Sequence, residues 1–260
     1  MPRSISVLVP LVLLSIASCC DHDPASPEPE PEYPTTLHPL SEEALNELRA
    51  DYAALNPRVC STLNEYGLTS GLCYEGTVGL PESTDVGNVI ARAKVVVTAN
   101  AQFTGVSDAS NLHVRSYLIS PQRRFLRIVF EPQCYAGLEV VGSTVSVHMD
   151  SLGALAINGC HYRQIYIPDP PLVSAAQAQA AIIGLQITWY DSDGNSQIYA
   201  VTGDSFQGEP ARVVLPHELE TSIQLRVAWQ IPVGTDILSW FVYVDTMDGQ
   251  LLKVEQLFYT

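Results

Sequence analysis

The chain has 260 residues, and its 28 acidic residues outnumber its 13 basic ones to give a formal net charge of −15. This excess of negative charge excludes nucleic acid as an expected partner, because binding to phosphates depends on clustered Lys and Arg. The length permits one large domain or two smaller ones, and composition does not choose between them.

Residues 1–18 have the layout of a signal peptide. A single positive charge at Arg3 precedes an apolar run over residues 5–16, and two small residues, Ala17 and Ser18, follow it. The apolar run is too short to cross about 30 Å of hydrocarbon as a stable anchor, so we expect no membrane-spanning helix after processing. Removal of the segment takes away one basic residue and no acidic one, which makes the mature net charge −16.

The tetrapeptide from Ile16 to Cys19 resembles the lipobox of bacterial lipoproteins, which is an aliphatic residue, two small residues and a cysteine. The resemblance implies that Cys19 becomes the acylated N-terminus and that a lipid bilayer is a partner. The alternative is cleavage by an ordinary signal peptidase, which leaves Cys19 and Cys20 without a role.

Residues 19–36 alternate acidic residues with proline after the cysteine and offer almost nothing to a core. Such a segment is expected to be an extended, solvated tether. We therefore expect an exported, lipid-anchored protein of the cell envelope, with the bacterial outer membrane as its location. The sequence leaves open whether the inner or the outer membrane holds the lipid, and which leaflet.

Four cysteines remain in the rest of the chain: Cys60, Cys73, Cys134 and Cys160. Disulfide bonds persist in exported proteins, so two bridges are expected. Three connectivities are possible, and we favour Cys60 with Cys73 and Cys134 with Cys160 because these close the shortest loops. A zinc site is the alternative. No Cys-x-x-Cys occurs, and His161 is adjacent to Cys160 rather than at ligand spacing, so we expect no metal.

Residues 37–168 are predicted to form a first α+β domain. Ser41 is typical of a helix N-cap, and the helix is expected to end at Asn56-Pro57. Residues 60–88 are rich in Gly, Ser, Thr and Pro, which predicts a loop stapled by a disulfide bond. Apolar patterning then predicts strands at residues 93–98, 112–119, 125–130, 139–149 and 154–158.

The Pro-rich segment 168–171 is the best candidate for an interior boundary, and residues 172–260 are predicted to form a second α+β domain. Ser174 and Gln177 have the spacing of a capping box, which begins a helix that ends near Gly184. Strands are predicted at residues 185–190, 197–201, 211–214, 224–231, 240–245 and 251–258.

A strand, a turn with Asp and Gly, and a second strand occur in both predicted domains, at residues 145–155 and 242–251. This repetition predicts an α+β fold of two related halves, each an antiparallel sheet with a helix packed on one face.

Two stretches resemble the propeptides of thermolysin-like metalloproteases. Residues 135–153 run from Tyr-Ala-Gly-Leu into a strand and an Asp-and-Gly hairpin, and they resemble the fungalysin/thermolysin propeptide motif. Residues 225–251, with the Ala-rich helix before them, resemble the PepSY domain that follows it, so that the resemblance covers about residues 112–260. It implies a fold that assists folding of a protease and inhibits it. The catalytic His-Glu-x-x-His is missing, because no second histidine follows His217-Glu218.

The remaining motifs favour ordinary turns over chemistry. Gly203-Asp204-Ser205 lacks the base and the oxyanion donors that a nucleophilic serine needs. Residues 191–195 resemble the start of a calcium loop, but Thr202 stands where the bidentate Glu is expected. We therefore expect a protein that is not an enzyme, with no catalytic residue and no cofactor.

Two functions remain open for such a chain. The first is a membrane-tethered, propeptide-like protein that inhibits a secreted or periplasmic protease, or assists its folding, through an exposed sheet edge. The alternative is a structural or scaffold lipoprotein of the envelope that binds a partner unrelated to proteases.

Overall fold

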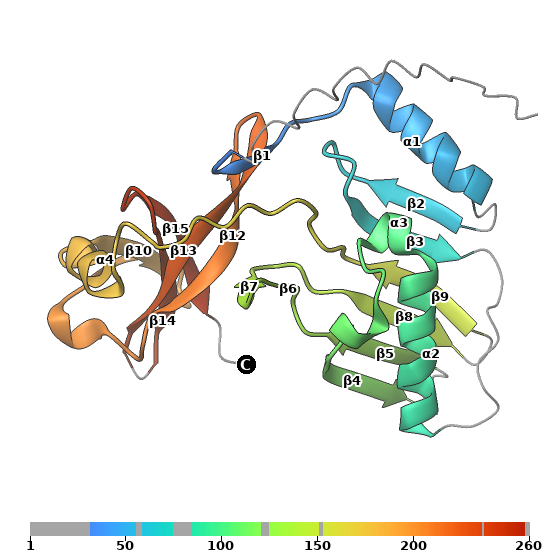
Figure 1. Ribbon diagram of the computed structural model, residues 1–260. Helices are drawn as coiled ribbons and strands as arrows, with labels where there is room; N and C mark the ends of the chain where they lie inside the picture. Colours follow the sequence, from blue (N-terminus) through green and yellow to red (C-terminus); the bar gives the residue numbers. More distant parts are fainter. Residues whose placement is uncertain are drawn as a thin grey trace, which may run out of the picture. The chain divides into compact units, whose positions relative to one another are not determined.

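Two large β-sheets form the framework of the protein (Figure 1) in the computed structural model, which describes residues 32–55, 59–74, 85–120, 125–150, 153–235 and 237–257. We call them the α2 sheet and the α4 sheet, after the helix that packs on each. A mixed α+β class is confirmed. In the described part of the chain, no helix is long and apolar enough to span a membrane.

The α2 sheet has six strands, each antiparallel to its neighbours, in the order β2-β3-β9-β8-β5-β4. The bounds of these strands are β2 Val59–Leu63, β3 Thr69–Tyr74, β9 Gly153–Asn158, β8 Ser146–Asp150, β5 Phe125–Phe130 and β4 Val114–Ser120.

Helix α2 (Val86–Ala99) covers one face of the α2 sheet, and its apolar side packs against Ile128, Val147 and Ile157 (Figure 1). The expected strand at residues 93–98 is therefore wrong. Its run of β-branched residues favours a strand, but Val89, Ala93, Val96 and Val97 recur at helical spacing and are buried. Asp85 begins the helix by accepting the Asn88 N–H at 3.1 Å.

The expected loop at residues 60–88 is also wrong in its described part, because β2 and β3 form a hairpin there. Residues 75–84 lie outside the described residues. The sequence predicted a loop because Gly and Ser are frequent, yet Leu63 and Leu72 alternate into the core and hold the hairpin on the sheet.

The α4 sheet has seven strands, in the order β15-β14-β13-β12-β7-β6, with β1 pairing β13 outside this path. The bounds are β15 Leu251–Leu257, β14 Ser239–Asp245, β13 Ser222–Gly234, β12 Ala211–Leu219, β7 Leu138–Val140, β6 Cys134–Tyr135 and β1 Thr35–Leu37. Most pairs are antiparallel, whereas β7 pairs β12 in parallel.

Helix α4 (Ala175–Ile182) packs on the α4 sheet through Ala178 and Ile182, which contact a core that includes Trp240 and Val242. The predicted capping box is confirmed. Ser174 accepts the Gln177 N–H at 3.3 Å, and the Gln177 side chain accepts the Ser174 N–H at 2.9 Å.

The description as two related halves is not confirmed. Strands β1, β6 and β7 precede the boundary expected at residues 168–171, yet they belong to the α4 sheet. The expected strand at residues 139–149 divides between the two sheets, because Gly142 turns the chain with a φ of 75°. Residues 32–260 accordingly form one compact unit.

The remaining elements lie outside the two large sheets. Helix α1 (Glu42–Leu55) begins as predicted, with the Ser41 hydroxyl accepting the Ala44 N–H at 3.1 Å. The Tyr52 hydroxyl donates to the Gln102 carbonyl at 3.0 Å, which joins α1 to α3. The other elements are α3 Ala101–Thr104, the 3₁₀ turns η1 Ala109–Asn111 and η2 Gly203–Ser205, and the hairpin of β10 Gln186–Tyr190 and β11 Ser196–Ala200.

Candidate functional site

The lipid attachment point expected at Cys19 lies outside the described residues, as does most of the expected tether. Acylation therefore stays a prediction from the lipobox residues. The expectation of a solvated tether is wrong for its last residues, 33–36, because Tyr33 bonds to Asp245 and Val227 and β1 pairs with β13.

Cys60 and Cys73 lie directly opposite each other on β2 and β3. Opposed residues of antiparallel strands have Cα atoms about 4.5–5.5 Å apart, which is within the range that a disulfide bond requires. The Cys73 thiol is free in the structure. The backbone register thus suits the expected bridge, and the bond itself stays a prediction.

The thiols of Cys134 and Cys160 are free in the structure, as that of Cys73 is, so the expected second bridge is not shown either. Cys134 is exposed on β6 of the α4 sheet, whereas Cys160 follows β9 of the α2 sheet. Burial raises the pKa of the Cys160 thiol above its ordinary value. Loop length alone does not reveal that the two cysteines belong to different sheets.

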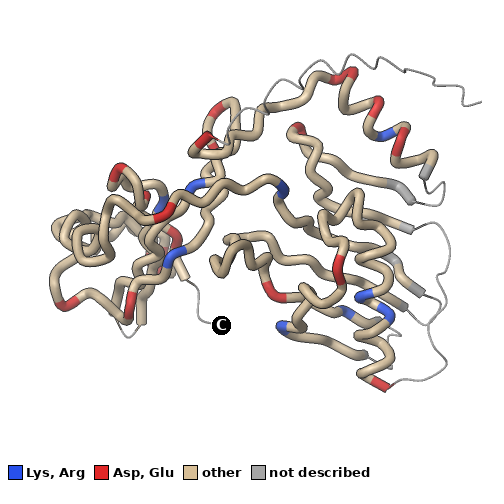
Figure 2. The backbone as a smooth tube through the Cα atoms, in the orientation of Figure 1, with Lys and Arg blue, Asp and Glu red and all other residues tan. Residues whose placement is uncertain are grey.

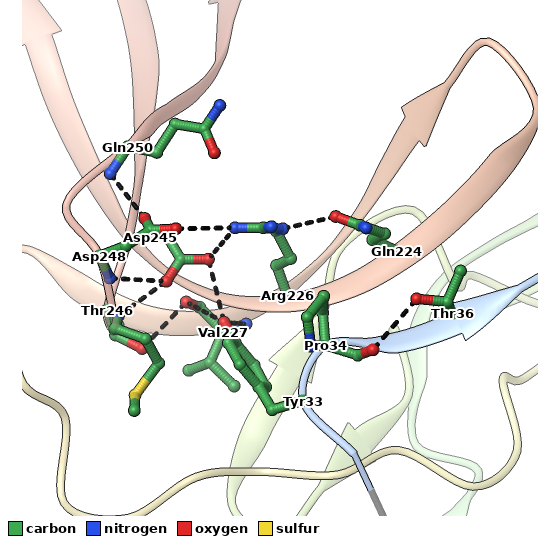
Figure 3. A network of polar contacts seen from close by, with 11 residues as sticks. Tyr33, Pro34, Thr36, Gln224, Arg226, Val227, Asp245, Thr246, Asp248 and Gln250 are labelled. Carbon is green, nitrogen blue, oxygen red and sulfur yellow. Dashed lines mark hydrogen bonds and ion pairs between the residues drawn. The ribbon is translucent and has the colours of Figure 1, made fainter.

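A polar cluster at the start of the described chain fastens the end of the tether to the α4 sheet (Figure 3). The Tyr33 hydroxyl donates to Asp245 Oδ2 at 3.0 Å and accepts the Val227 N–H at 3.0 Å. Two residues later β1 begins, and it pairs with residues 223–225 of β13, beyond the part of β13 that β14 covers. We call this arrangement the tether clasp.

The centre of the tether clasp is a buried ion pair. Asp245 is fully buried, and its carboxylate lies 2.9 Å from the Arg226 guanidinium. The Met247 N–H also donates to this carboxylate, at 2.7 Å. Burial, and then the charge of Asp245, raise the pKa of the Tyr33 hydroxyl well above its ordinary value, so it stays protonated as a donor. These contacts hold Tyr33 against β13 and β14.

Strand β4 forms an edge of the α2 sheet and carries large side chains exposed to solvent. Tyr117 is 54% exposed and Leu118 is 57% exposed. Since β4 pairs only with β5 in the described part of the chain, the backbone groups on its outer side have no strand partner. An edge of this kind accepts an added strand from another chain.

The other edges of the two large sheets are better protected. Helix α1 contacts β2 at the opposite edge of the α2 sheet. At the outer edge of the α4 sheet, β15 carries the ion pair of Lys253 with Glu255 at 3.4 Å, and charged side chains discourage strand addition. At its other edge, β6 has two residues. The β4 edge is therefore the best candidate for a protein-binding site.

A pocket of about 210 Å³ lies beside β6 and is lined by Gly105, Val106, Ser107, Asn111, His113, Gln133, Cys134, Tyr135 and His161. Burial lowers the pKa of His161 to about 4, so its ring is neutral at pH 7. Its Nε2 has no hydrogen-bond partner among the described residues. The lining as described includes no carboxylate that could orient His113 or His161, and among the described residues Cys134 forms no hydrogen bond with either ring.

The motifs weighed in the sequence form ordinary turns. Ser205 is buried in η2, where its hydroxyl accepts the Thr202 N–H at 2.8 Å. The Asp191 carboxylate accepts the N–H groups of Asp193 and Asn195 within the β10–β11 turn. Among the described residues, no group of three or more His, Cys, Asp or Glu side chains is placed to hold a metal ion.

Comparisons with known proteins give weak structural similarity alone. No family model matches the chain, and no curated protein matches it. Among solved structures, the chain is similar to the Bacillus megaterium YpeB C-terminal domain, with a TM-score of 0.38 and 10% identity over 85% of this chain and 100% of that one. The resemblance to metalloprotease propeptides therefore stays a prediction.

Sequence reasoning anticipated a sheet edge as the binding element but did not identify which one. Residues 112–119 were correctly predicted as a strand, and the pairing order that leaves it at the edge depends on long-range contacts. One local signal was present, since Tyr117 and Leu118 are consecutive and one of them must face away from the core.

Proposed function

We propose that this protein is a non-catalytic, lipid-anchored protein of the bacterial cell envelope that binds an exported protease by adding a strand of it to the β4 edge. Binding of this kind inhibits the protease or assists its folding. Acylated Cys19 holds the chain on the membrane, and the tether of residues 19–36 ends at the clasp on the α4 sheet.

The β4 edge is the observation that supports the binding part of the proposal. Its exposed Tyr117 and Leu118 provide apolar contact, and its outer backbone groups provide the hydrogen bonds that an incoming strand requires. Protease as the partner class rests on the resemblance of residues 112–260 to propeptides, and the lipid anchor rests on residues 16–19.

Inhibition is tested by mixing the protein, purified after export, with thermolysin-like metalloproteases at micromolar concentration. We expect hydrolysis of a peptide substrate to slow. The double variant Tyr117→Glu, Leu118→Glu places charge on the edge and should lose at least tenfold in inhibition, whereas Leu251→Glu on β15 should not. No slowing by any such protease, or slowing that the double variant retains, contradicts the proposal and leaves the scaffold alternative.

The anchor is tested separately by growing cells with labelled palmitate. The wild-type chain should incorporate label and sediment with membranes, and Cys19→Ala should do neither. Unlabelled wild-type protein in the soluble fraction contradicts the lipid-anchored part of the proposal without affecting the β4 edge.

A further inference from the structure

Basic residues are concentrated around the β4 edge of this acidic protein. Residues 86–130 contain six of the 13 Lys and Arg residues of the chain and one of its 28 Asp and Glu residues. Figure 2 shows Lys and Arg on α2, β4 and β5 and an acidic position at the start of α2, while most acidic residues lie on other elements. The local charge is thus opposite in sign to the charge of the whole molecule.

The described cations of this region have no carboxylate partner among the described residues. They are Arg92, Lys94, Arg115 and Arg127. The cations of the α4 sheet are different, since Arg212 pairs with Asp169, Arg226 with Asp245 and Lys253 with Glu255. The one acidic residue of the region, Asp108, is engaged by the Ser110 N–H at 2.8 Å.

Two more carboxylates border the region, since Asp85 begins α2 and Glu131 follows β5, where its N–H donates to the His113 carbonyl at 2.8 Å beside β4. Neither forms an ion pair with the cations of this region among the described residues, and basic residues still outnumber acidic ones over residues 85–131, six to three.

Two of these cations lie at the edge itself. Arg115 occupies the irregularity in β4 between Val114 and Ser116 and is exposed. Arg127 is the cross-strand partner of Leu118, one strand further in, and is also exposed. A strand added beside β4 would place its side chains next to those of β4, within reach of long guanidinium side chains. Acidic residues on that strand would meet Arg115 and Arg127.

We propose that the β4 edge selects extended peptide segments in which acidic residues alternate with β-branched or apolar ones. This inference rests on the proposed function, because it names the chemistry of the segment that the same edge binds. An anionic membrane surface would also be attracted by the cations, but it does not use the unpaired backbone groups of β4 or the exposed Tyr117.

The test measures binding of the protein, purified after export, to three fluorescent heptapeptides in which Thr alternates with Glu, Gln or Lys. We expect the Glu peptide to bind at least tenfold more tightly than the Gln peptide and the Lys peptide to bind most weakly. Raising the salt concentration should reduce the preference for Glu, since exposed charges are screened. N-methylation of alternate residues of the Glu peptide should abolish binding.

The matched variants are the double variant Arg115→Gln, Arg127→Gln and the control Arg212→Gln. The double variant should lose the preference for Glu over Gln while still binding the Gln peptide, and the control should retain the preference.

Equal affinity for all three peptides overturns the inference but not the proposed function. Failure of every peptide to bind overturns both. The inference is also overturned if the protein binds vesicles of anionic phosphatidylglycerol, these vesicles displace the Glu peptide, and N-methylation of the peptide does not weaken its binding. That result would favour a membrane surface as the partner.

Discussion

At the scale of single residues, the most consequential contact is the buried pair of Arg226 and Asp245. A fully buried carboxylate retains its charge at low cost only when a cation and hydrogen-bond donors satisfy it, and here Arg226, the Tyr33 hydroxyl and the Met247 N–H do so. The pair also links β13 to the residue that ends the tether. Loss of either partner should therefore affect both stability and the attachment of residues 33–37.

Arg226→Gln is expected to lower the free energy of unfolding by roughly 3–5 kcal/mol, because it leaves the Asp245 carboxylate buried and uncompensated. Arg212→Gln is the matched control, since its partner Asp169 is 76% exposed and a surface pair contributes about 0–1 kcal/mol. Urea unfolding of the two variants measures the difference. Equal decreases in the free energy of unfolding would show that the buried pair stabilises the protein no more than the exposed pair does.

His161 should make the protein less stable in acid. Burial lowers the pKa of its ring to about 4 from an ordinary 6.5. Between these pH values the ring is therefore protonated in the unfolded chain and neutral in the folded one. Stability from this group is complete above pH 6.5 and is lost as the pH falls to about 4.

The expected loss from His161 is roughly 3 kcal/mol between those pH values. His161→Gln should remove that part of the pH dependence, whereas substitution of His113, an exposed residue lining the same pocket, should leave it in place. Urea unfolding at pH 7 and pH 4.5 compares the three proteins. An unchanged pH dependence in His161→Gln would show that this ring is not the source.

At the scale of elements, local signals predicted helix ends better than they predicted which apolar runs form strands. The capping box at Ser174 was predictable because its hydrogen bonds join residues three apart. Whether α2 is a helix or a strand was not predictable, because its Val-rich sequence suits either element. Its burial against β5, β8 and β9 decides in favour of a helix. For the same reason, the division of residues 139–149 between two sheets could not be predicted.

Ser174→Ala should lower the free energy of unfolding by about 1 kcal/mol, because the first turn of α4 loses the acceptor of the Gln177 N–H. Ser192→Ala, in the exposed turn between β10 and β11, is the control and should change little. Thermal unfolding checks both. A Ser174→Ala variant as stable as the wild type would mean that the cap adds nothing in this context.

The register of β2 and β3 predicts that the exported protein contains a Cys60–Cys73 disulfide bond, while Cys134 and Cys160 remain thiols. Alkylation without reduction, followed by peptide mass spectrometry, should modify Cys134 and leave Cys60 and Cys73 joined. A Cys134–Cys160 peptide would instead support the pairing favoured by loop length and contradict this prediction.

At the scale of the whole molecule, one chain combines the proposed lipid anchor at its N-terminus with the proposed binding edge at β4. The sequence alone was sufficient for the signal peptide, the lipobox and the tether as predictions, because these are local patterns. It was insufficient for the β4 edge, because edge position follows from the pairing order of six strands that span residues 59–158.

The most direct test is site-specific photo-crosslinking in cells that produce the protein with a photoreactive residue in place of Tyr117 or, as a control, of Leu251 on β15. The account predicts a covalent adduct with an exported protease from position 117 and none from position 251. An absence of adducts at position 117, or the same adducts from both positions, would contradict it.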